Sequence, residues 1–131
     1  MMIDPAMQQF EWSVRALAQP AAVQLRLYPS FVEVADELAL EFEEHLQRID
    51  VDQLPPAQRD AVRALDQALE EMSGPAHAEL WEVSALDVAP EWTRLRELAS
   101  QVIAAMDWSR EPPPIDRGAL YVGSDTRALH G

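Results

Sequence analysis

Apolar residues recur every three or four positions along most of this chain, which is the spacing of one face of an α-helix. From Met7 to Leu17 this spacing is regular, with Asp4 placed to cap the first turn and Pro5 at its first position. A second segment opens at Pro56, and its apolar stripe consists of Val62, Leu65, Leu69 and Met72. A third opens at Pro90 and ends near Trp108, with an apolar stripe of Trp92, Leu95, Ala99, Val102 and Met106. The pattern predicts an amphipathic helix in each segment.

The segment after Pro29 carries the strongest helix signal. Ser30 and Glu33 have the spacing of a capping box, in which each side chain bonds the other residue's backbone N–H. We expect the helix to run to about Ile49. Its predicted core face consists of Phe31, Ala35, Leu38, Phe42, Leu46 and Ile49. Its other side carries Glu33, Glu37, Glu41 and Glu44, with Leu40 projecting among these carboxylates.

Two shorter segments leave their structure open. Ala21–Tyr28 lies between Pro20 and Pro29 and alternates like a strand, but the helices predicted on both sides favour a short helix. Residues 79–86, which include Trp81, fit either a short helix or an extended piece. Before them, Gly74 is placed to end a helix in a left-handed conformation.

These elements predict an all-α protein, a single-domain bundle of four or five helices over residues 1–110. The length of 131 residues suits one domain. The prolines at 112–114 break the pattern, and we expect residues 111–131 to form an irregular C-terminal tail, either packed on the bundle or loose.

Composition excludes several classes of function. Cysteine is absent, which removes disulfides, thiolate nucleophiles and thiolate metal sites. No apolar run approaches the roughly 18 residues of a membrane span, and the first residues do not resemble a secretory signal. A net charge of −13 opposes binding to nucleic acid, whose phosphates would be repelled. We therefore expect a cytoplasmic protein that binds neither nucleic acid nor membrane.

The chain offers little for catalysis. It contains no nucleophile elbow and no glycine-rich phosphate loop. Glu37, Glu41 and His45 are one helical turn apart, but di-iron bundles use Glu-x-x-His on each of two helices. Position 42 is Phe, and no second copy of the motif occurs. We therefore expect no catalytic centre, metal or cofactor, and a metal-dependent enzyme built on these three residues is the last of the alternatives.

The distribution of charge is more informative. Between Glu33 and Asp87 there are 15 acidic and three basic residues, so nearly all of the excess negative charge lies in the middle of the chain. Such a surface steers a basic protein partner by long-range attraction. The predicted partner-binding residues are Glu33, Glu37, Leu40, Glu41 and Glu44. The alternative is an acidic face that is only solvated, in which case the next candidate surface lies around Trp81 and Leu86.

Two stretches of sequence resemble a known group of proteins. They are FVEVADELALEF at residues 31–42, and residues 80–99 with Leu80-Trp81, Ala85-Leu86, Pro90-Glu91-Trp92, Leu95-Arg96 and Leu98-Ala99. Together they resemble small helical immunity proteins encoded beside bacterial polymorphic toxins, including contact-dependent growth inhibition systems. The resemblance implies a non-enzymatic protein that binds and neutralises one cognate toxin domain, often a basic nuclease. An adaptor or regulatory subunit with another protein partner is the alternative.

Overall fold

The computed structural model describes residues 4–115, and all regular structure within them is helical. The α-helices are α1 (Pro5–Leu17), α2 (Ala21–Arg26), α3 (Val34–Leu46), α4 (Pro56–Glu71), α5 (Ala85–Val88) and α6 (Pro90–Met106). Two 3₁₀ segments, η1 (Val51–Gln53) and η2 (Pro75–Trp81), join them. The all-α prediction is confirmed, and the segment from Ala21 is helical rather than extended.

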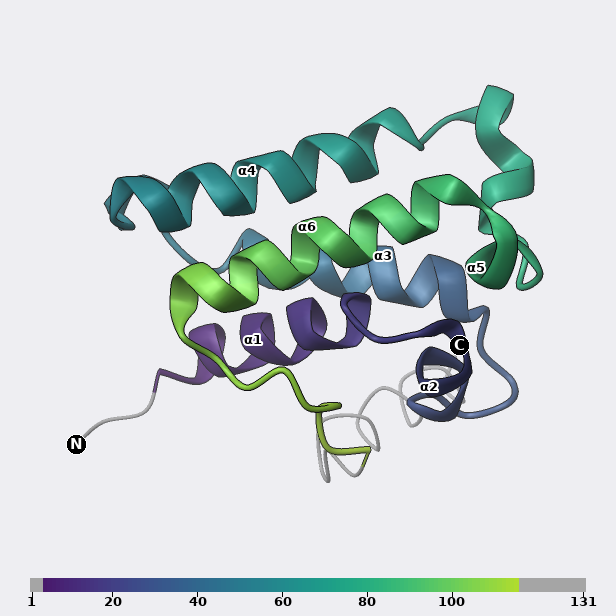
Figure 1. Ribbon diagram of the computed structural model, residues 1–131, viewed down its shortest axis with the longest axis horizontal. Helices are drawn as coiled ribbons and strands as arrows, with labels where there is room; N and C mark the ends of the chain where they lie inside the picture. The colour runs from purple at the N-terminus through teal and green to yellow at the C-terminus, as the bar shows by residue number, and fades with distance from the viewer. Residues whose placement is uncertain (1–3, 116–131) are drawn as a thin grey trace, which may run out of the picture.

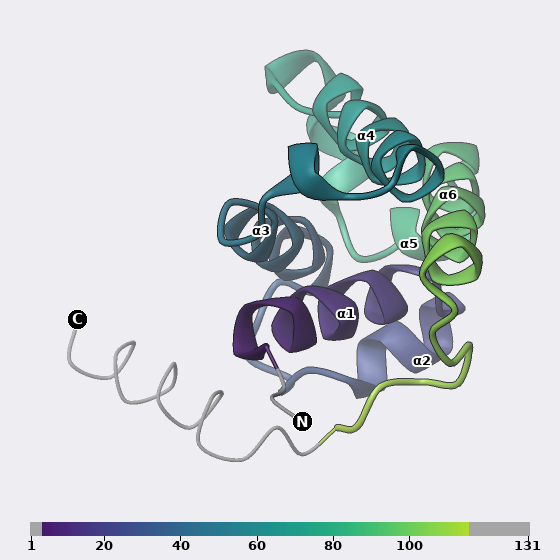
Figure 2. The ribbon, with the colours of Figure 1, turned by 90° about the vertical axis from the view of Figure 1, so that its left-hand side faces the viewer.

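The four long helices form an antiparallel bundle in chain order α1, α3, α4 and α6 (Figure 1). α1 packs against α3 and α6, and α4 packs against α6. Figure 2 shows α3 and α6 on opposite sides, with α1 below them and α4 above. α2 and α5 contact each other at the end of the bundle where α3 and α6 begin.

The core follows the predicted stripes closely. The stripe of α4 is buried at every position, and α6 buries Trp92, Leu95, Ala99 and Val102 as expected. Met106 is only partly buried, and the last fully buried residue of α6 is Ile103. Across the bundle, the rings of Phe10 and Phe42 lie 5.5 Å apart and join α1 to α3.

The start of α3 differs from the prediction. The Val32 N–H donates to the Pro29 carbonyl, so residues 29–32 form a turn and the helix begins only at Val34. Glu33 occupies the cap position with no side-chain hydrogen bond to the helix, so the predicted capping box does not form. Phe31 consequently leaves the predicted core face and is exposed. The helix also ends at Leu46, and Ile49 packs on the core from the following loop.

Arg96 of α6 forms hydrogen bonds with three other segments at one end of the bundle. Its guanidinium donates to the Gln19 carbonyl at 2.9 Å, to the Gln24 side-chain oxygen at 3.0 Å, and to the Leu86 carbonyl. Gln24 is wholly buried, and its amide donates in turn to two carbonyls at the end of α1. Burial lowers the pKa of Arg96 from its ordinary value, and Asp87 partly offsets this effect. These contacts fix α1, α2 and α5 against α6.

The residues after α6 return along α1. The Trp12 indole N–H donates to the Pro114 carbonyl at 2.8 Å, and Arg15 donates to the Glu111 carbonyl at 3.0 Å. Pro113, within this segment, is buried. The proline-rich break therefore packs on the bundle as far as Pro114. The rest of the predicted tail, residues 116–131, lies outside the described residues.

Candidate functional site: the acidic outer face of α3

Leu40 lies at the centre of the outer face of α3. Its side chain is 49% exposed, whereas Leu38 and Phe42 on the opposite side are buried in the core. On a helix the surface neighbours of a residue are those three and four positions away. For Leu40 all four are acidic: Asp36, Glu37, Glu43 and Glu44. The fold thus places one apolar side chain inside a ring of carboxylates, and we call these five residues the α3 face.

Three of these carboxylates form no ion pair with any of residues 4–115. The ion pairs in this part of the chain join Glu11 to Arg15, Asp60 to Arg59, and Asp52 to Arg63. None of them involves Asp36, Glu43 or Glu44, which are all exposed. Their charge is therefore available to a group that approaches from outside.

The five predicted binding residues lie in three places: on the α3 face, just before the helix, and at the contact with Tyr28. Glu37, Leu40 and Glu44 lie on the α3 face, and Glu33 immediately precedes the helix. Glu41 faces the buried side, where the Tyr28 hydroxyl donates to its carboxylate at 2.8 Å. Because Tyr28 is buried and packs its ring edge-on against Trp12, this hydrogen bond serves the junction between α2 and α3.

Sequence reasoning missed two members of the α3 face, Asp36 and Glu43. The signal was present, because they lie four residues before and three residues after Leu40. The predicted acidic side followed the flank of Leu40 that carries Glu37, Glu41 and Glu44, whereas Asp36 and Glu43 lie on the other flank.

The acidic surface continues from α3 onto α4. A groove of about 350 Å³ separates the two helices and is lined by Glu43, Leu46, Gln47, Asp66 and Glu70. Burial raises the pKa of Asp66 above its ordinary value, and the like charge of Glu70 one turn away raises it further. The groove therefore concentrates negative charge that the fold itself leaves uncompensated.

The candidate metal ligands do not assemble into a site. Glu37, Glu41 and His45 occupy successive turns of α3, with the two carboxylates partly buried and His45 buried. Within residues 4–115, no group of three or more His, Asp or Glu side chains is placed to hold a metal ion. None of the helices in this range has the length and apolar character needed to cross a bilayer.

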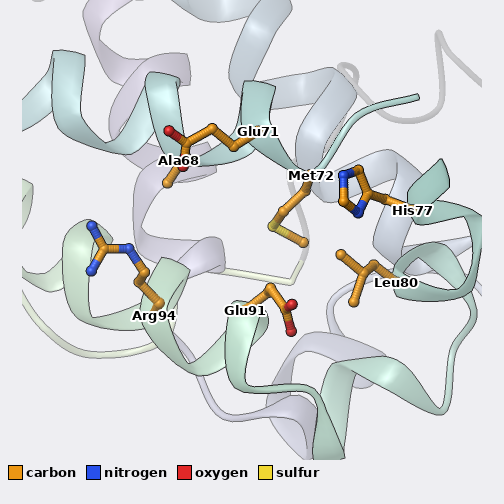
Figure 3. Close-up of a pocket in the computed structure, with 7 residues that line it drawn as sticks. All are labelled: Ala68, Glu71, Met72, His77, Leu80, Glu91 and Arg94. Carbon is orange, nitrogen blue, oxygen red and sulfur yellow. The ribbon is translucent and has the colours of Figure 1, made fainter. Parts of the chain in front are cut away.

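A second small pocket lies between α4, η2 and the start of α6 (Figure 3). Its apolar floor is formed by the buried residues Ala68, Met72 and Leu80, and four polar side chains surround it: Glu71, His77, Glu91 and Arg94. Figure 3 shows Arg94 and His77 on opposite sides of Met72. At about 230 Å³, the pocket is smaller than the roughly 300–1,000 Å³ typical of sites for drug-sized ligands.

The alternative surface around Trp81 and Leu86 is only partly accessible, with Trp81 partly buried and residues 82–84 exposed. Trp81 packs edge-on against Trp92 at 5.6 Å and donates its N–H to the Met72 carbonyl. Leu86 is completely buried. A docking surface around these two residues would therefore use the accessible part of Trp81 and its exposed neighbours Glu82 and Val83, because Leu86 itself is inside.

Comparison with known protein families, with characterised proteins and with solved structures finds no match for this chain. The chemistry of the α3 face and of the groove beside it is therefore the basis for assigning a role.

Proposed function

We propose that this chain is a non-enzymatic binding protein that docks a basic protein partner on the α3 face. One observation carries the proposal: Leu40 is half-exposed at the centre of the face, and acidic residues occupy all four neighbouring helical positions. An apolar anchor within a charged rim is the usual anatomy of a protein-binding hot spot.

The energetics support the same role. Like charges one turn apart on a helix destabilise it by a few tenths of a kcal/mol per pair. Two such pairs run along the edge of the α3 face, Glu37 with Glu41 and Glu41 with Glu44. A basic partner would relieve the repulsion within the face and gain faster association from the net charge of −13.

We further propose that the partner is a toxin domain and that this chain acts as its immunity protein in the cytoplasm. The resemblance of residues 31–42 and 80–99 to helical immunity proteins supports this assignment, and the acidic face suits the basic nucleases that such proteins often neutralise. An adaptor would use the same face but would not protect a cell from a toxin.

The proposal predicts that a toxin gene lies next to the gene for this chain. The test measures the association and dissociation rates of that toxin domain at low and high salt. Glu44→Lys should slow association several-fold at low salt, and less at high salt, where the Debye length is shorter. Leu40→Ala should instead speed dissociation about tenfold at either salt concentration. Glu97→Lys, which makes the same charge change at an exposed position of α6, is the matched control.

A growth assay with the same toxin domain separates immunity from adaptor function. Wild type and Glu97→Lys should protect the cell, and a Leu40→Ala/Glu44→Lys double variant should not. If neither α3 variant changes the kinetics, the face is only a solvated surface and the proposed docking site is wrong. If binding occurs without protection, the partner assignment is wrong and the adaptor alternative stands.

A further inference from the structure

Exposed apolar side chains gather at the end of the bundle where α3 begins. Six large apolar side chains are exposed among residues 4–115: Leu25, Phe31, Leu40, Val83, Val88 and Ile115. Three of them, Leu25, Phe31 and Val83, line a single groove of about 390 Å³. We call it the end groove; its other lining residues are Pro29, Ser30, Val32, Glu33 and Val34. Scattered apolar residues are ordinary on a surface, whereas a contiguous patch marks an interaction site.

The three side chains come from segments that are distant in the sequence. Leu25 lies on the outer side of α2, whose buried residues are Ala21 and Gln24. Val83 lies in the loop between η2 and α5, and Figure 1 shows α2, α5 and the start of α3 at the same end of the bundle. The tertiary fold therefore creates the groove, and no local pattern predicts it.

Phe31 is held outward by the backbone. The turn closed by the Val32 N–H and the Pro29 carbonyl displaces Phe31 from the helix and leaves it 69% exposed. Exposing so large an aromatic surface to water is unfavourable. A partner side chain that covers the ring would recover this free energy on binding.

Among residues 4–115, Glu33 is the only charged residue that lines the end groove. By helical spacing, Glu33 lies on the same side of α3 as Glu37 and Leu40, because these residues are four and seven positions apart. The distance along the axis from Glu33 to Leu40 is about 10 Å at 1.5 Å per residue. The end groove and the α3 face therefore form one continuous surface that is apolar at one end and acidic along the helix.

We propose that the end groove is a second anchor site, which takes an aromatic or aliphatic side chain of the partner from a segment rich in Arg or Lys. This inference rests on the proposed function for the α3 face and adds the chemistry of the bound segment. Charge complementarity selects this occupant: a second copy of the chain carries the same net charge of −13, and an anionic membrane would also repel it.

Three capped tripeptides, Arg-Trp-Arg, Glu-Trp-Glu and Arg-Ser-Arg, test the chemistry directly by NMR of the methyl groups of the full chain. Arg-Trp-Arg should shift the methyl signals of Leu25, Val32 and Val83. Glu-Trp-Glu should bind several-fold more weakly, because Glu33 repels it, and Arg-Ser-Arg should bind about tenfold more weakly or not at all. Equal shifts from the two Trp peptides, or no shift at these methyls, would overturn the proposal.

Phe31→Ser and Val88→Ser form a matched pair of variants, because both residues are exposed but only Phe31 lines the end groove. Phe31→Ser should abolish the Arg-Trp-Arg shifts at Leu25 and Val83 and speed dissociation of the toxin domain about tenfold. Val88→Ser should change neither. Two results would contradict the proposed occupant. One is sedimentation of the free chain as a dimer, and the other is binding to neutral phosphatidylcholine vesicles, if Phe31→Ser abolishes the effect.

The outcome for the end groove is separable from that for the α3 face. If the tripeptides bind at Leu25 and Val83 while Glu44→Lys leaves toxin association unchanged, the α3 assignment fails and the groove remains. If Glu44→Lys slows association while the tripeptides do not bind, the end groove is not an anchor site and the α3 assignment remains.

Discussion

The junction around Arg96 and the outer face of α3 are both rich in polar side chains, but they use them in opposite ways. At the junction, Arg96 donates to carbonyls from the end of α1 and from α5, and Gln24 donates to the last carbonyls of α1. On the α3 face, Asp36, Glu43 and Glu44 form no ion pair with any residue in the 4–115 range. The junction is closed to solvent at Gln24, whereas the α3 face is open at Leu40.

The difference separates residues that the fold requires from residues that it tolerates. Removing a donor from the junction leaves buried carbonyls without a partner, which costs the full desolvation penalty of each. Removing a carboxylate from the α3 face leaves nothing unsatisfied and relieves repulsion. Residues of the second kind can therefore be substituted without loss of the fold.

The largest effect is expected from Arg96→Ala. The variant removes three hydrogen bonds from a partly buried guanidinium, so we expect the free energy of unfolding to fall by about 2–4 kcal/mol. Arg94→Ala, two residues earlier at an exposed position of the same helix, should change it by less than about 0.5 kcal/mol. Urea unfolding of both variants measures the difference. Equal losses would show that the junction depends on helix packing rather than on its hydrogen bonds.

A smaller effect is expected from Trp92→Phe. A benzene ring remains, but the five-membered part of the indole is lost together with the N–H that donates to the buried Leu80 carbonyl at 2.7 Å. The unpaired carbonyl and the lost packing together cost about 1–3 kcal/mol. Leu40→Ala on the α3 face should cost no more than about 1 kcal/mol, because about half of the Leu40 surface is already exposed. Thermal or urea unfolding compares the two. A Leu40→Ala loss as large as that of Trp92→Phe would place Leu40 in the structural core and contradict its role as an anchor.

The smallest effect concerns Asp66 in the groove beside the α3 face. Its raised pKa means that the folded state binds more protons than the unfolded state, so ionised Asp66 lowers the free energy of unfolding at neutral pH. Asp66→Asn should therefore stabilise the protein near neutral pH, by less than about 0.5 kcal/mol because the groove is open to solvent. The gain should shrink as the pH falls through the raised pKa toward the ordinary value of 3.8.

Urea unfolding of this variant at several pH values provides the measurement. Asp60→Asn removes the same charge at an exposed position of α4 and should show no such gain. A constant difference between Asp66→Asn and wild type across this pH range would show that the carboxylate does not titrate in the groove.

The sequence alone determined the long helices and most of their core faces. The apolar spacing of α1, α4 and α6 correctly indicated Phe10, Val62 and Trp92 as core residues. It did so because periodicity is a property of the local backbone: any 3.6-residue repeat of apolar side chains needs a neighbour to cover it. The proline and aspartate that open α1 also act within a few residues, so Asp4 accepts the Ala6 N–H as expected.

Only the tertiary structure decided which residues outside the apolar stripes form contacts within the fold and which stay exposed. Whether Ser30 caps a helix depends on the turn that Pro29 makes, and whether Glu41 faces solvent depends on where α2 places Tyr28. The end groove needs three segments to meet. A repeat in the sequence defines the buried side of a helix. Whether the residues beside that stripe are buried or exposed depends on segments that are distant along the chain. The positions of those segments follow from tertiary packing, which no local pattern encodes.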